Sequence, residues 1–289
     1  MLSGLPLFVA ARRRLSSTGD QNLKLASYLK HGLFGAVALI IAGARLVPEH
    51  GSHRVVFATP SAMASPVASV STEKRAGGLL EKTTAAVQAF AAAVRPLSHP
   101  KALELAFHSY FTYQAAHPAE VKKPLLYFVD YGLPSTEPRG YIFDMGSLAI
   151  VEGPFMVAHG RGSSVTQYGT PTRFSNASGS AATSLGLYVA ESLYRFVGHT
   201  AGQTYSSVGL RLKGVSRNFN DNALARGVVA HGAPYVTPGR AGRSEGCPAM
   251  EQSRAQRVLP ELAGGGMVFL FAPDQQWMTS DPWVSATAE

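Results

Sequence analysis

The chain has 289 residues, and its hydrophobic content of 46% is ordinary for a globular protein of one or two domains. Its one cysteine, Cys247, excludes an intramolecular disulfide. The net charge of +8 comes mostly from residues 1–58, which hold seven of the 26 basic and two of the 18 acidic residues. The remainder is close to charge balance, so we expect no nucleic-acid partner.

Residues 1–44 have the order of an export signal. Basic residues come first and end at Lys30, an apolar run follows over 33–44, and small residues offer cleavage sites at 42–44 or 62–64. The apolar run of about twelve residues is short for a membrane span, which needs about 20. We therefore expect a signal peptide and an exported protein. An uncleaved inner-membrane anchor is the alternative.

Residues 45–76 are rich in Ser, Ala, Pro and Val without a clear period, which predicts a linker. Helices are predicted over 77–94 and from Pro100 onward. From Pro124 the pattern changes to short runs rich in aromatic and β-branched residues, bounded by Gly, Pro and Ser, which predict strands. The predicted strands are Leu125–Tyr131, Tyr141–Met145, Ala149–Val157, Leu185–Val189, Val208–Leu212, Gly227–Ala230 and Met267–Phe271.

Two further local patterns complete the predicted organisation. Residues 253–263 are predicted to be a late helix, and Asn220-Asp221-Asn222 a capped turn before a short helix at Ala223–Arg226. We predict a signal peptide or membrane anchor at 1–44 and a linker with a helical lead-in at 45–96. One catalytic domain is predicted at 97–289, with a mainly β (α+β) fold and flanking helices.

Cys247 lies in a segment that does not resemble a strand interior. Gly242, Gly246 and Pro248 favour irregular, exposed backbone, and His231 lies sixteen residues upstream. A thiol with an adjacent imidazole can act as a nucleophile with its general base. The alternative is a small buried cysteine without a chemical role.

The charges around this thiol have opposite effects. Arg240 and Arg243 favour a thiolate, and Glu245 opposes it. The arginines can also hold a substrate carboxylate through paired hydrogen bonds, as can Arg211. Their alternative is a solvated or loop-fixing role.

Seven segments of the second half occur in a recognisable order. They are Val129-Asp130-Tyr131, Val157–Gly162, Phe174-Ser175-Asn176, Thr183–Gly186, Leu210–Gly214, Asn220–Ala223, and Val229–Ala233 through Gly242–Ala249. Together they resemble the L,D-transpeptidase catalytic domain (YkuD-like) family, in particular its murein L,D-transpeptidase catalytic domain branch. The resemblance covers about residues 124 to 271, and the final segment is its most specific part.

The resemblance implies a YkuD-like β-sandwich or barrel and an acyl-transfer enzyme of the bacterial cell wall. Its donor would be a peptidoglycan stem tetrapeptide. Cys247 would attack the carbonyl of the third residue, a diamino acid, and expel the terminal D-alanine. The thioester would pass to an amine of a neighbouring stem, to water in a carboxypeptidase reaction, or to an attached protein. The protein would be periplasmic or part of the cell envelope, with peptidoglycan stem peptides as its partners and inner-membrane association through its N-terminus in the anchored case.

The resemblance also carries residue roles. His231 would be the base, oriented by the carbonyl of Gly232, and the amides of Gly246 and Cys247 are candidates for the oxyanion donors. His159 would face the same cleft, although a structural histidine at a strand end is the alternative. Weaker candidates for substrate binding are therefore His159, Arg211, Arg240, Arg243 and Ser244.

This sequence departs from the family pattern in two places. Many transpeptidases of this fold carry an arginine shortly after the cysteine, whereas Pro248 and Ala249 follow here. The carboxylate contact must then come from elsewhere. The segment 198–207 also differs from the branch pattern, and the loop around His199 could reshape access for the acceptor.

Other classes of protein stay open. A zinc hydrolase could use Cys247, His231, His159 and His199, but the catalytic half lacks a close ligand pair, so we expect neither a metal nor a cofactor. A papain-like hydrolase would place its cysteine before its histidine. An exported wall-binding module with an inert cysteine is the alternative outside enzymes.

Overall fold

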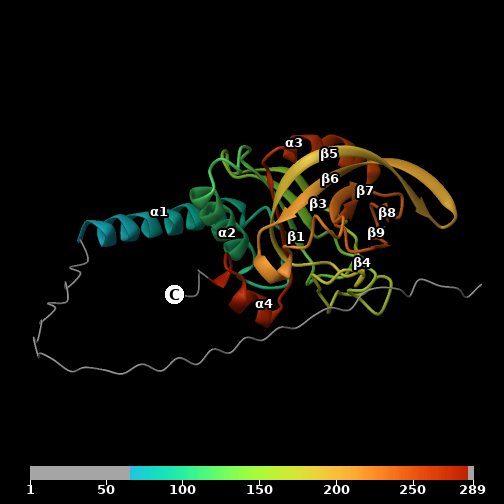
Figure 1. The fold of residues 1–289 in the computed structure, drawn as a ribbon, viewed down its shortest axis with the longest axis horizontal. Helices are drawn as coiled ribbons and strands as arrows, with labels where there is room; N and C mark the ends of the chain where they lie inside the picture. The colour runs from blue at the N-terminus through green and yellow to red at the C-terminus, as the bar shows by residue number, and fades with distance from the viewer. Residues whose placement is uncertain (1–65, 286–289) are drawn as a thin grey trace, which may run out of the picture. The chain divides into compact units, whose positions relative to one another are not determined.

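The computed structural model describes residues 66–285 (Figure 1), so the predicted signal peptide lies outside the described residues. Among the described residues, no helix is long and apolar enough to cross a membrane. The helices are α1 (Pro66–Phe90), α2 (Ala102–Ala116), α3 (Gln252–Leu262) and α4 (Gln275–Ser280), with a short 3-10 helix η1 at Arg217–Phe219.

The strands form one large mixed sheet in the order β11-β7-β6-β5-β12-β1-β2-β3. Their bounds are β1 (Leu125–Asp130), β2 (Gly140–Asp144), β3 (Ala149–Phe155), β5 (Gly186–Thr200), β6 (Gln203–Gly214), β7 (Val229–Gly232), β11 (Ala249–Met250) and β12 (Met267–Phe271). Two small sheets pair β4 (His159–Gly160) with β10 (Arg243–Ser244) and β8 (Val236–Thr237) with β9 (Arg240–Ala241). The predicted mainly β, α+β fold class is confirmed.

The core lies between this sheet and the helices that cover it. Phe90 of α1 and Phe107 of α2 pack against Phe143 of β2, with ring centroids 4.6 and 5.4 Å away. All five residues of β12 are buried, which explains why Met267–Phe271 is a continuous apolar run rather than an alternating one. Each such buried side chain contributes about 1.5–3 kcal/mol of hydrophobic free energy.

Two of the predicted helix assignments are wrong. α1 begins at Pro66, inside the predicted linker, and proline suits a first helical turn because the N–H it lacks would have no partner there. The turns at Asp221–Gly227 replace the predicted helix at Ala223–Arg226. The positive φ of Gly227, +68°, stops the helical turn before it can propagate.

The largest difference from prediction is the β5–β6 hairpin. Its strands were predicted to cover only Leu185–Val189 and Val208–Leu212, but they continue to a two-residue turn at Ala201-Gly202. Both turn residues have positive φ, 48° and 75°, as a tight hairpin turn of this hand requires. The polar residues near the turn hide the alternation that begins at Tyr194 and Phe196. The hairpin therefore arches beyond the other strands of the sheet (Figure 1).

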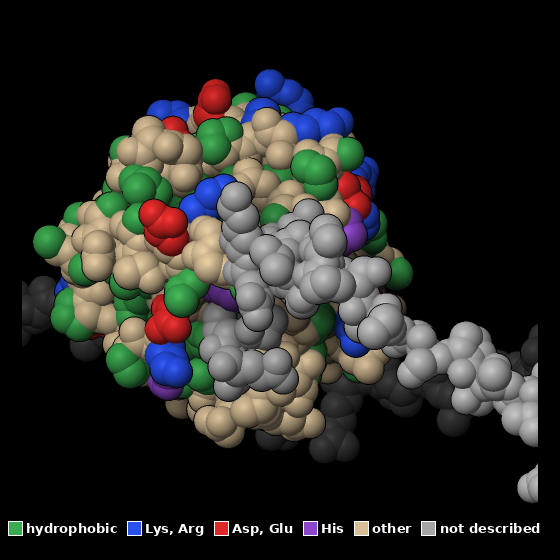
Figure 2. Space-filling view, turned by 90° about the vertical axis from the view of Figure 1, so that its left-hand side faces the viewer, with side chains coloured by type: hydrophobic (Ala, Val, Ile, Leu, Met, Phe, Trp, Pro, Cys, Tyr) green, Lys and Arg blue, Asp and Glu red, His purple; other side chains and the backbone are tan. Residues whose placement is uncertain are grey.

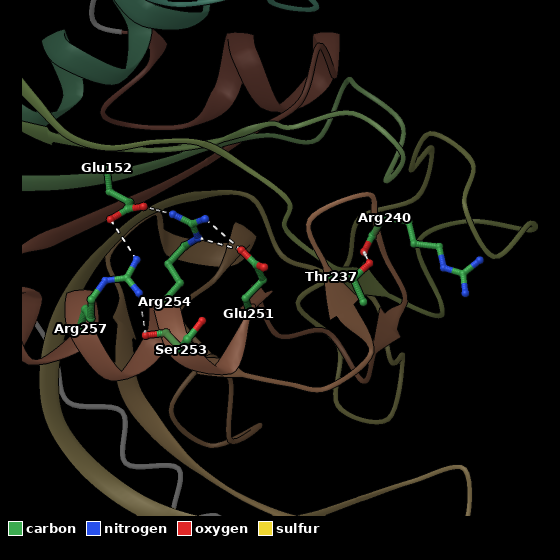
Figure 3. Close-up of polar contacts among 7 residues, drawn as sticks. All are labelled: Glu152, Thr237, Arg240, Glu251, Ser253, Arg254 and Arg257. Atoms are coloured by element: carbon green, nitrogen blue, oxygen red, sulfur yellow. Dashed lines mark hydrogen bonds and ion pairs between the residues drawn. The ribbon is translucent and has the colours of Figure 1, made fainter.

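An ionic cluster holds the start of α3 to β3 (Figure 3). Arg254 bonds Glu152 of β3 and donates to Glu251 over 2.9 Å, and its guanidinium lies 4.6 Å from the centroid of the Phe155 ring. Arg257 reaches the same Glu152 over 3.4 Å, but its side chain is 58% exposed, against 17% for Arg254. Since exposed pairs contribute little, Arg254 is the member that fixes the helix.

Replacing Arg254 with Ala should lower the free energy of unfolding by about 1–3 kcal/mol, because two half-buried carboxylates lose their partner and Phe155 loses its cover. Arg257→Ala is the matched control and should cost under about 1 kcal/mol. Urea unfolding of both variants measures the difference. Equal losses in the two variants would show that burial does not distinguish these arginines.

Candidate active site

Cys247 lies in a tight loop between β10 and β11, called here the Cys247 loop (residues 244–248). Ser244 fixes it from within, since its Oγ donates to the carbonyl of Cys247 over 2.7 Å and accepts from the amide of Gly246 over 3.1 Å. From outside, the amide of Arg161 donates to the carbonyl of Ser244 over 2.7 Å. Ser244 thus shapes the backbone that carries the thiol.

Gly246 sits where only glycine fits. Its φ is +124°, and a Cβ there would lie 2.8 Å from the carbonyl oxygen of Ala182. Its amide is already used by Ser244. Of the two amides proposed as oxyanion donors, only that of Cys247 has no acceptor among residues 66–285.

The Cys247 thiol is half-buried and lies against the start of β7. Its Sγ is 4.0 Å from the carbonyl oxygen of Gly227 and forms a hydrogen bond with the Val229 backbone. Burial raises the pKa of the thiol, the Val229 bond and the Arg226 guanidinium lower it, and Glu245 raises it further. The net result is a raised pKa, so the resting thiol is protonated at neutral pH.

His231 lies on β7, the strand that the sulfur touches. Its Nδ1 donates to the carbonyl of Gly232 over 3.1 Å, which fixes the tautomer and leaves Nε2 as the proton acceptor. Its amide donates to the carbonyl of Pro248 over 3.4 Å, and its register partner in β11 is Ala249. Burial lowers the pKa of the imidazole, and the bond to Gly232 raises it less. The sequence-predicted base therefore lies on the strand adjoining the Cys247 loop, in its neutral form.

Aromatic residues that the sequence analysis did not single out surround this pair. The Phe196 ring meets His231 edge-to-face with centroids 5.5 Å apart, and Tyr235 lies 6.4 Å from it. Burial raises the pKa of Tyr194, Tyr205 and Tyr235, and the Cys247 charge adds to the increase in each. Tyr194, Phe196 and Tyr205 come from the β5–β6 hairpin, so its distal half forms one wall of the site. The alternation at Tyr194 and Phe196 was the signal in the sequence.

His159 lies in β4 and is fully buried. Arg139, also fully buried, donates to its Nδ1 over 2.9 Å, so Nε2 carries the proton and has no partner in the described part of the chain. Burial, followed by the charges of Arg139 and Arg243, lowers the pKa of His159 to about 3. A neutral imidazole with its acceptor nitrogen occupied favours the structural alternative over a role in substrate binding.

The three candidate arginines differ in position. Arg211 is exposed, stacks 4.5 Å from the centroid of the Tyr194 ring and pairs in register with Val229, so it lies beside the thiol-bearing end of the site. Arg243 donates to the carbonyl of Ser164 over 3.3 Å, which is a loop-fixing contact.

The side chain of Arg240 extends away from the β8–β9 hairpin (Figure 3), and its guanidinium lies 5.4 Å from the centroid of the Tyr168 ring. Neither Arg240 nor Arg243 is among the groups that shift the pKa of Cys247, contrary to the expectation from sequence. Arg226, which sequence reasoning missed, provides the positive charge instead. It is a single arginine five positions before His231, with no motif to mark it.

Two properties of the structure concern metal ions and charged ligands. Within residues 66–285, no group of three or more His, Cys, Asp or Glu side chains is placed to hold a metal ion. On the face drawn in Figure 2, acidic side chains lie among the basic ones, so this face carries both signs of charge.

Comparison with protein families decides the class of this domain. The model of the L,D-transpeptidase catalytic domain matches residues 95–271, more than half of the chain. The chain belongs to that family. The match contains the Cys247 loop, β7 and the β5–β6 hairpin, so the geometry described above is that of an L,D-transpeptidase catalytic domain.

Several solved L,D-transpeptidases are similar to this one. The enzyme from Mycobacterium smegmatis is 14% identical over 52% of this chain and 59% of its own, with a TM-score of 0.34. The Stackebrandtia nassauensis enzyme is 15% identical over 59% of this chain and 66% of its own, with a TM-score of 0.32. L,D-transpeptidase 3 from Mycobacterium tuberculosis is 14% identical over 52% of this chain and 61% of its own, with a TM-score of 0.31. The chain thus spans about three fifths of the length of the M. smegmatis structure. No curated protein matches the chain.

Gly246→Ala should remove activity and lower the free energy of unfolding by about 1–3 kcal/mol, because the new Cβ strikes the carbonyl oxygen of Ala182 and φ is unfavourable. Gly239→Ala is the control, since a Cβ there meets nothing within 4 Å. Turnover and urea unfolding measure both effects. A fully active Gly246→Ala protein would show that the loop can relax without moving the thiol.

The buried His159 should make stability fall at acid pH. The folded protein binds a proton there only near pH 3, whereas the unfolded chain binds one near its ordinary pKa of 6.5. The stability that neutral His159 contributes is complete above about pH 6.5 and is lost as the pH falls towards 3. Wild type should therefore lose about 1 kcal/mol per pH unit more than His159→Gln between these limits, as measured by urea unfolding. Parallel pH profiles would contradict this assignment.

Proposed function

We propose that the protein is a cysteine-dependent peptidoglycan L,D-transpeptidase acting on stem tetrapeptides in cell-wall remodelling. The observation that carries the proposal is the arrangement around β7. The Cys247 sulfur lies against the first residues of the strand, and Nδ1 of His231 on the same strand is held by Gly232, which leaves Nε2 as the proton acceptor. Family membership supports the reaction class.

In this mechanism Nε2 of His231 takes the Cys247 proton as the sulfur attacks the carbonyl of the diamino acid. The amide of Cys247 is available to donate to the resulting oxyanion. Collapse breaks the bond to D-alanine, whose amine takes the proton from His231. The incoming amine of a second stem then gives its proton to His231 and attacks the thioester. The C–S bond breaks, and His231 returns that proton to the sulfur, which restores the thiol.

The resting proton distribution suits this cycle. The pKa of Cys247 is raised and that of His231 is lowered, each mainly by burial, so both groups are neutral before substrate binds. The thiolate then forms only as the carbonyl is attacked. A half-buried protonated thiol is also protected from oxidation, which requires the thiolate.

The same proposal covers location and partners. An enzyme that acts on stem peptides works outside the cytoplasm, which agrees with the export signal expected at 1–44. We propose an exported protein of the periplasm or cell envelope, with inner-membrane association if the leader is retained. Among the candidate substrate-binding arginines, Arg211 lies across from Val229, whose backbone adjoins the thiol.

Incubation with purified disaccharide-tetrapeptide, followed by mass analysis, tests the proposal. Cys247→Ala should abolish product formation, and His231→Ala should reduce it by about 100-fold or more, since each removes a group that transfers a proton or bonds to carbon. His199→Ala is the control for the release of D-alanine, because that histidine is exposed on the hairpin and its loop is expected to affect the acceptor only. Wild-type turnover in Cys247→Ala would overturn the mechanism.

The products distinguish the alternatives. Cross-linked dimers with loss of D-alanine support transpeptidation. Tripeptide alone indicates an L,D-carboxypeptidase that uses the same thioester. An intact substrate together with a thiol that reacts only after denaturation would support the wall-binding alternative.

A further inference from the structure

Arg226 lies beside the Cys247 loop without belonging to it. Its Nη1 donates to the carbonyl of Ser175 over 2.8 Å, and its Nη2 donates to the carbonyl of Ala182 over 2.7 Å and to Oγ of Ser180 over 3.3 Å. One planar guanidinium therefore ties together the two ends of the segment 175–182. Lysine cannot reproduce this contact, because an ammonium is a point donor rather than a rigid fork.

The segment that Arg226 closes is the wall on which the Cys247 loop rests. A Cβ on Gly246 would lie 2.8 Å from the carbonyl oxygen of Ala182 and 3.4 Å from Nη2 of Arg226. Gly246 therefore packs directly on this bonded pair. The guanidinium is thus within contact distance of the residue that precedes the thiol.

The turn that carries Arg226 also touches the sulfur. The amide of Arg226 donates to the carbonyl of Asn222 over 2.9 Å, and the next residue, Gly227, turns the chain with a φ of +68°. The carbonyl oxygen of Gly227 lies 4.0 Å from Sγ of Cys247. Arg226 carries the cation, and the next residue, Gly227, contacts the thiol. One short turn therefore determines the positions of both contacts.

Other groups near the thiol do not replace this charge. Glu245 is of opposite sign, exposed and paired with Arg161 over 2.7 Å. Arg211 stacks on the Tyr194 ring and is not among the groups that shift the thiol equilibrium. His231, Tyr131, Tyr194, Tyr205 and Tyr235 are neutral at pH 7. Among the groups that shift the thiol equilibrium, Arg226 is the one that carries a positive charge.

We propose that Arg226 is the positioning residue of this site, which stabilises the thiolate of Cys247 by its charge and holds the Cys247 loop through the segment 175–182. This inference rests on the proposed role of Cys247 as the nucleophile. The charge is carried by a residue outside the Cys247 loop, and the guanidinium lies against the loop at Gly246. Many transpeptidases of this fold carry an arginine shortly after the cysteine, whereas Pro248 and Ala249 follow Cys247 here.

The test measures the rate at which iodoacetamide alkylates Cys247 as a function of pH. It needs no substrate, and the chain has no second cysteine to interfere. Arg226→Gln should raise the apparent pKa of the thiol by about one unit, which slows alkylation about tenfold at neutral pH. Arg173→Gln is the matched control and should leave the profile unchanged, because that exposed guanidinium forms no hydrogen bond or ion pair within residues 66–285.

Two further variants distinguish the effect of the Arg226 charge from the effect of its hydrogen bonds to the segment 175–182. Arg226→Lys keeps the charge but loses the fork, so its profile should lie between those of wild type and Arg226→Gln. Ser180→Asp leaves Arg226 in place and puts a carboxylate beside its Nη2, which should raise the apparent thiol pKa in the same direction as Arg226→Gln. The second variant tests the charge even if Arg226→Gln fails to fold.

A thiol pKa that stays at the wild-type value in folded Arg226→Gln, or in Ser180→Asp, would overturn the proposal and leave a loop-bracing role only. That result is distinct from failure of the proposed function, which is measured by Cys247→Ala on stem peptides. An inactive wild type whose thiol pKa nevertheless responds to Arg226→Gln would remove the transpeptidase assignment and retain the electrostatic one.

Discussion

The pairing of β7 with β11 is the constraint on which the site depends. These strands run parallel, with His231 opposite Ala249, and the amide of His231 bonds the carbonyl of Pro248. The proposed base is thereby tied to the backbone directly after the thiol. A slip of one residue would turn His231 to the opposite face of the sheet, where Gly232 now packs against α3. No side chain fits there, since a Cβ on Gly232 would already lie 2.9 Å from that of Ala255. Packing of α3 therefore fixes the face on which the imidazole lies.

Burial has opposite consequences for the two members of the proposed pair. It raises the pKa of the thiol and lowers that of the imidazole, so charge separation between them is disfavoured in the free protein. What lowers the cost of the thiolate comes from groups outside the pair, namely the Val229 backbone and Arg226. Proton transfer and stabilisation of the thiolate therefore involve different groups. In the proposed mechanism His231 moves the proton, while the Val229 backbone and the Arg226 charge determine how readily the proton leaves the thiol.

The sequence predicted those features that depend on local pattern. Runs such as Met267–Phe271 became strands because every residue in them is apolar and buried, and glycine at 246 marked a backbone that no other residue adopts. The hairpin beyond Val189 was not predicted, because polar residues near its turn hide the alternation that begins at Tyr194 and Phe196. Its two strands stabilise each other by pairing up to the turn. The role of Arg226 and the partner of the buried His159 were also missed, although a structural histidine at a strand end was the alternative given for His159. Both depend on partners far away in sequence, such as Ser175 and Arg139, and nothing in the neighbouring residues identifies them.

The long hairpin connects the fold to the acid–base balance of the site. Phe196 reaches His231 only because β5 and β6 continue past the sheet to the turn at Ala201-Gly202. The same ring that covers the imidazole removes water from it, and loss of water is the main reason its pKa falls. A lower pKa makes a weaker base but keeps the imidazole unprotonated, which a proton acceptor requires. The long hairpin thus brings to His231 an aromatic ring that contributes to the burial on which its neutral state depends.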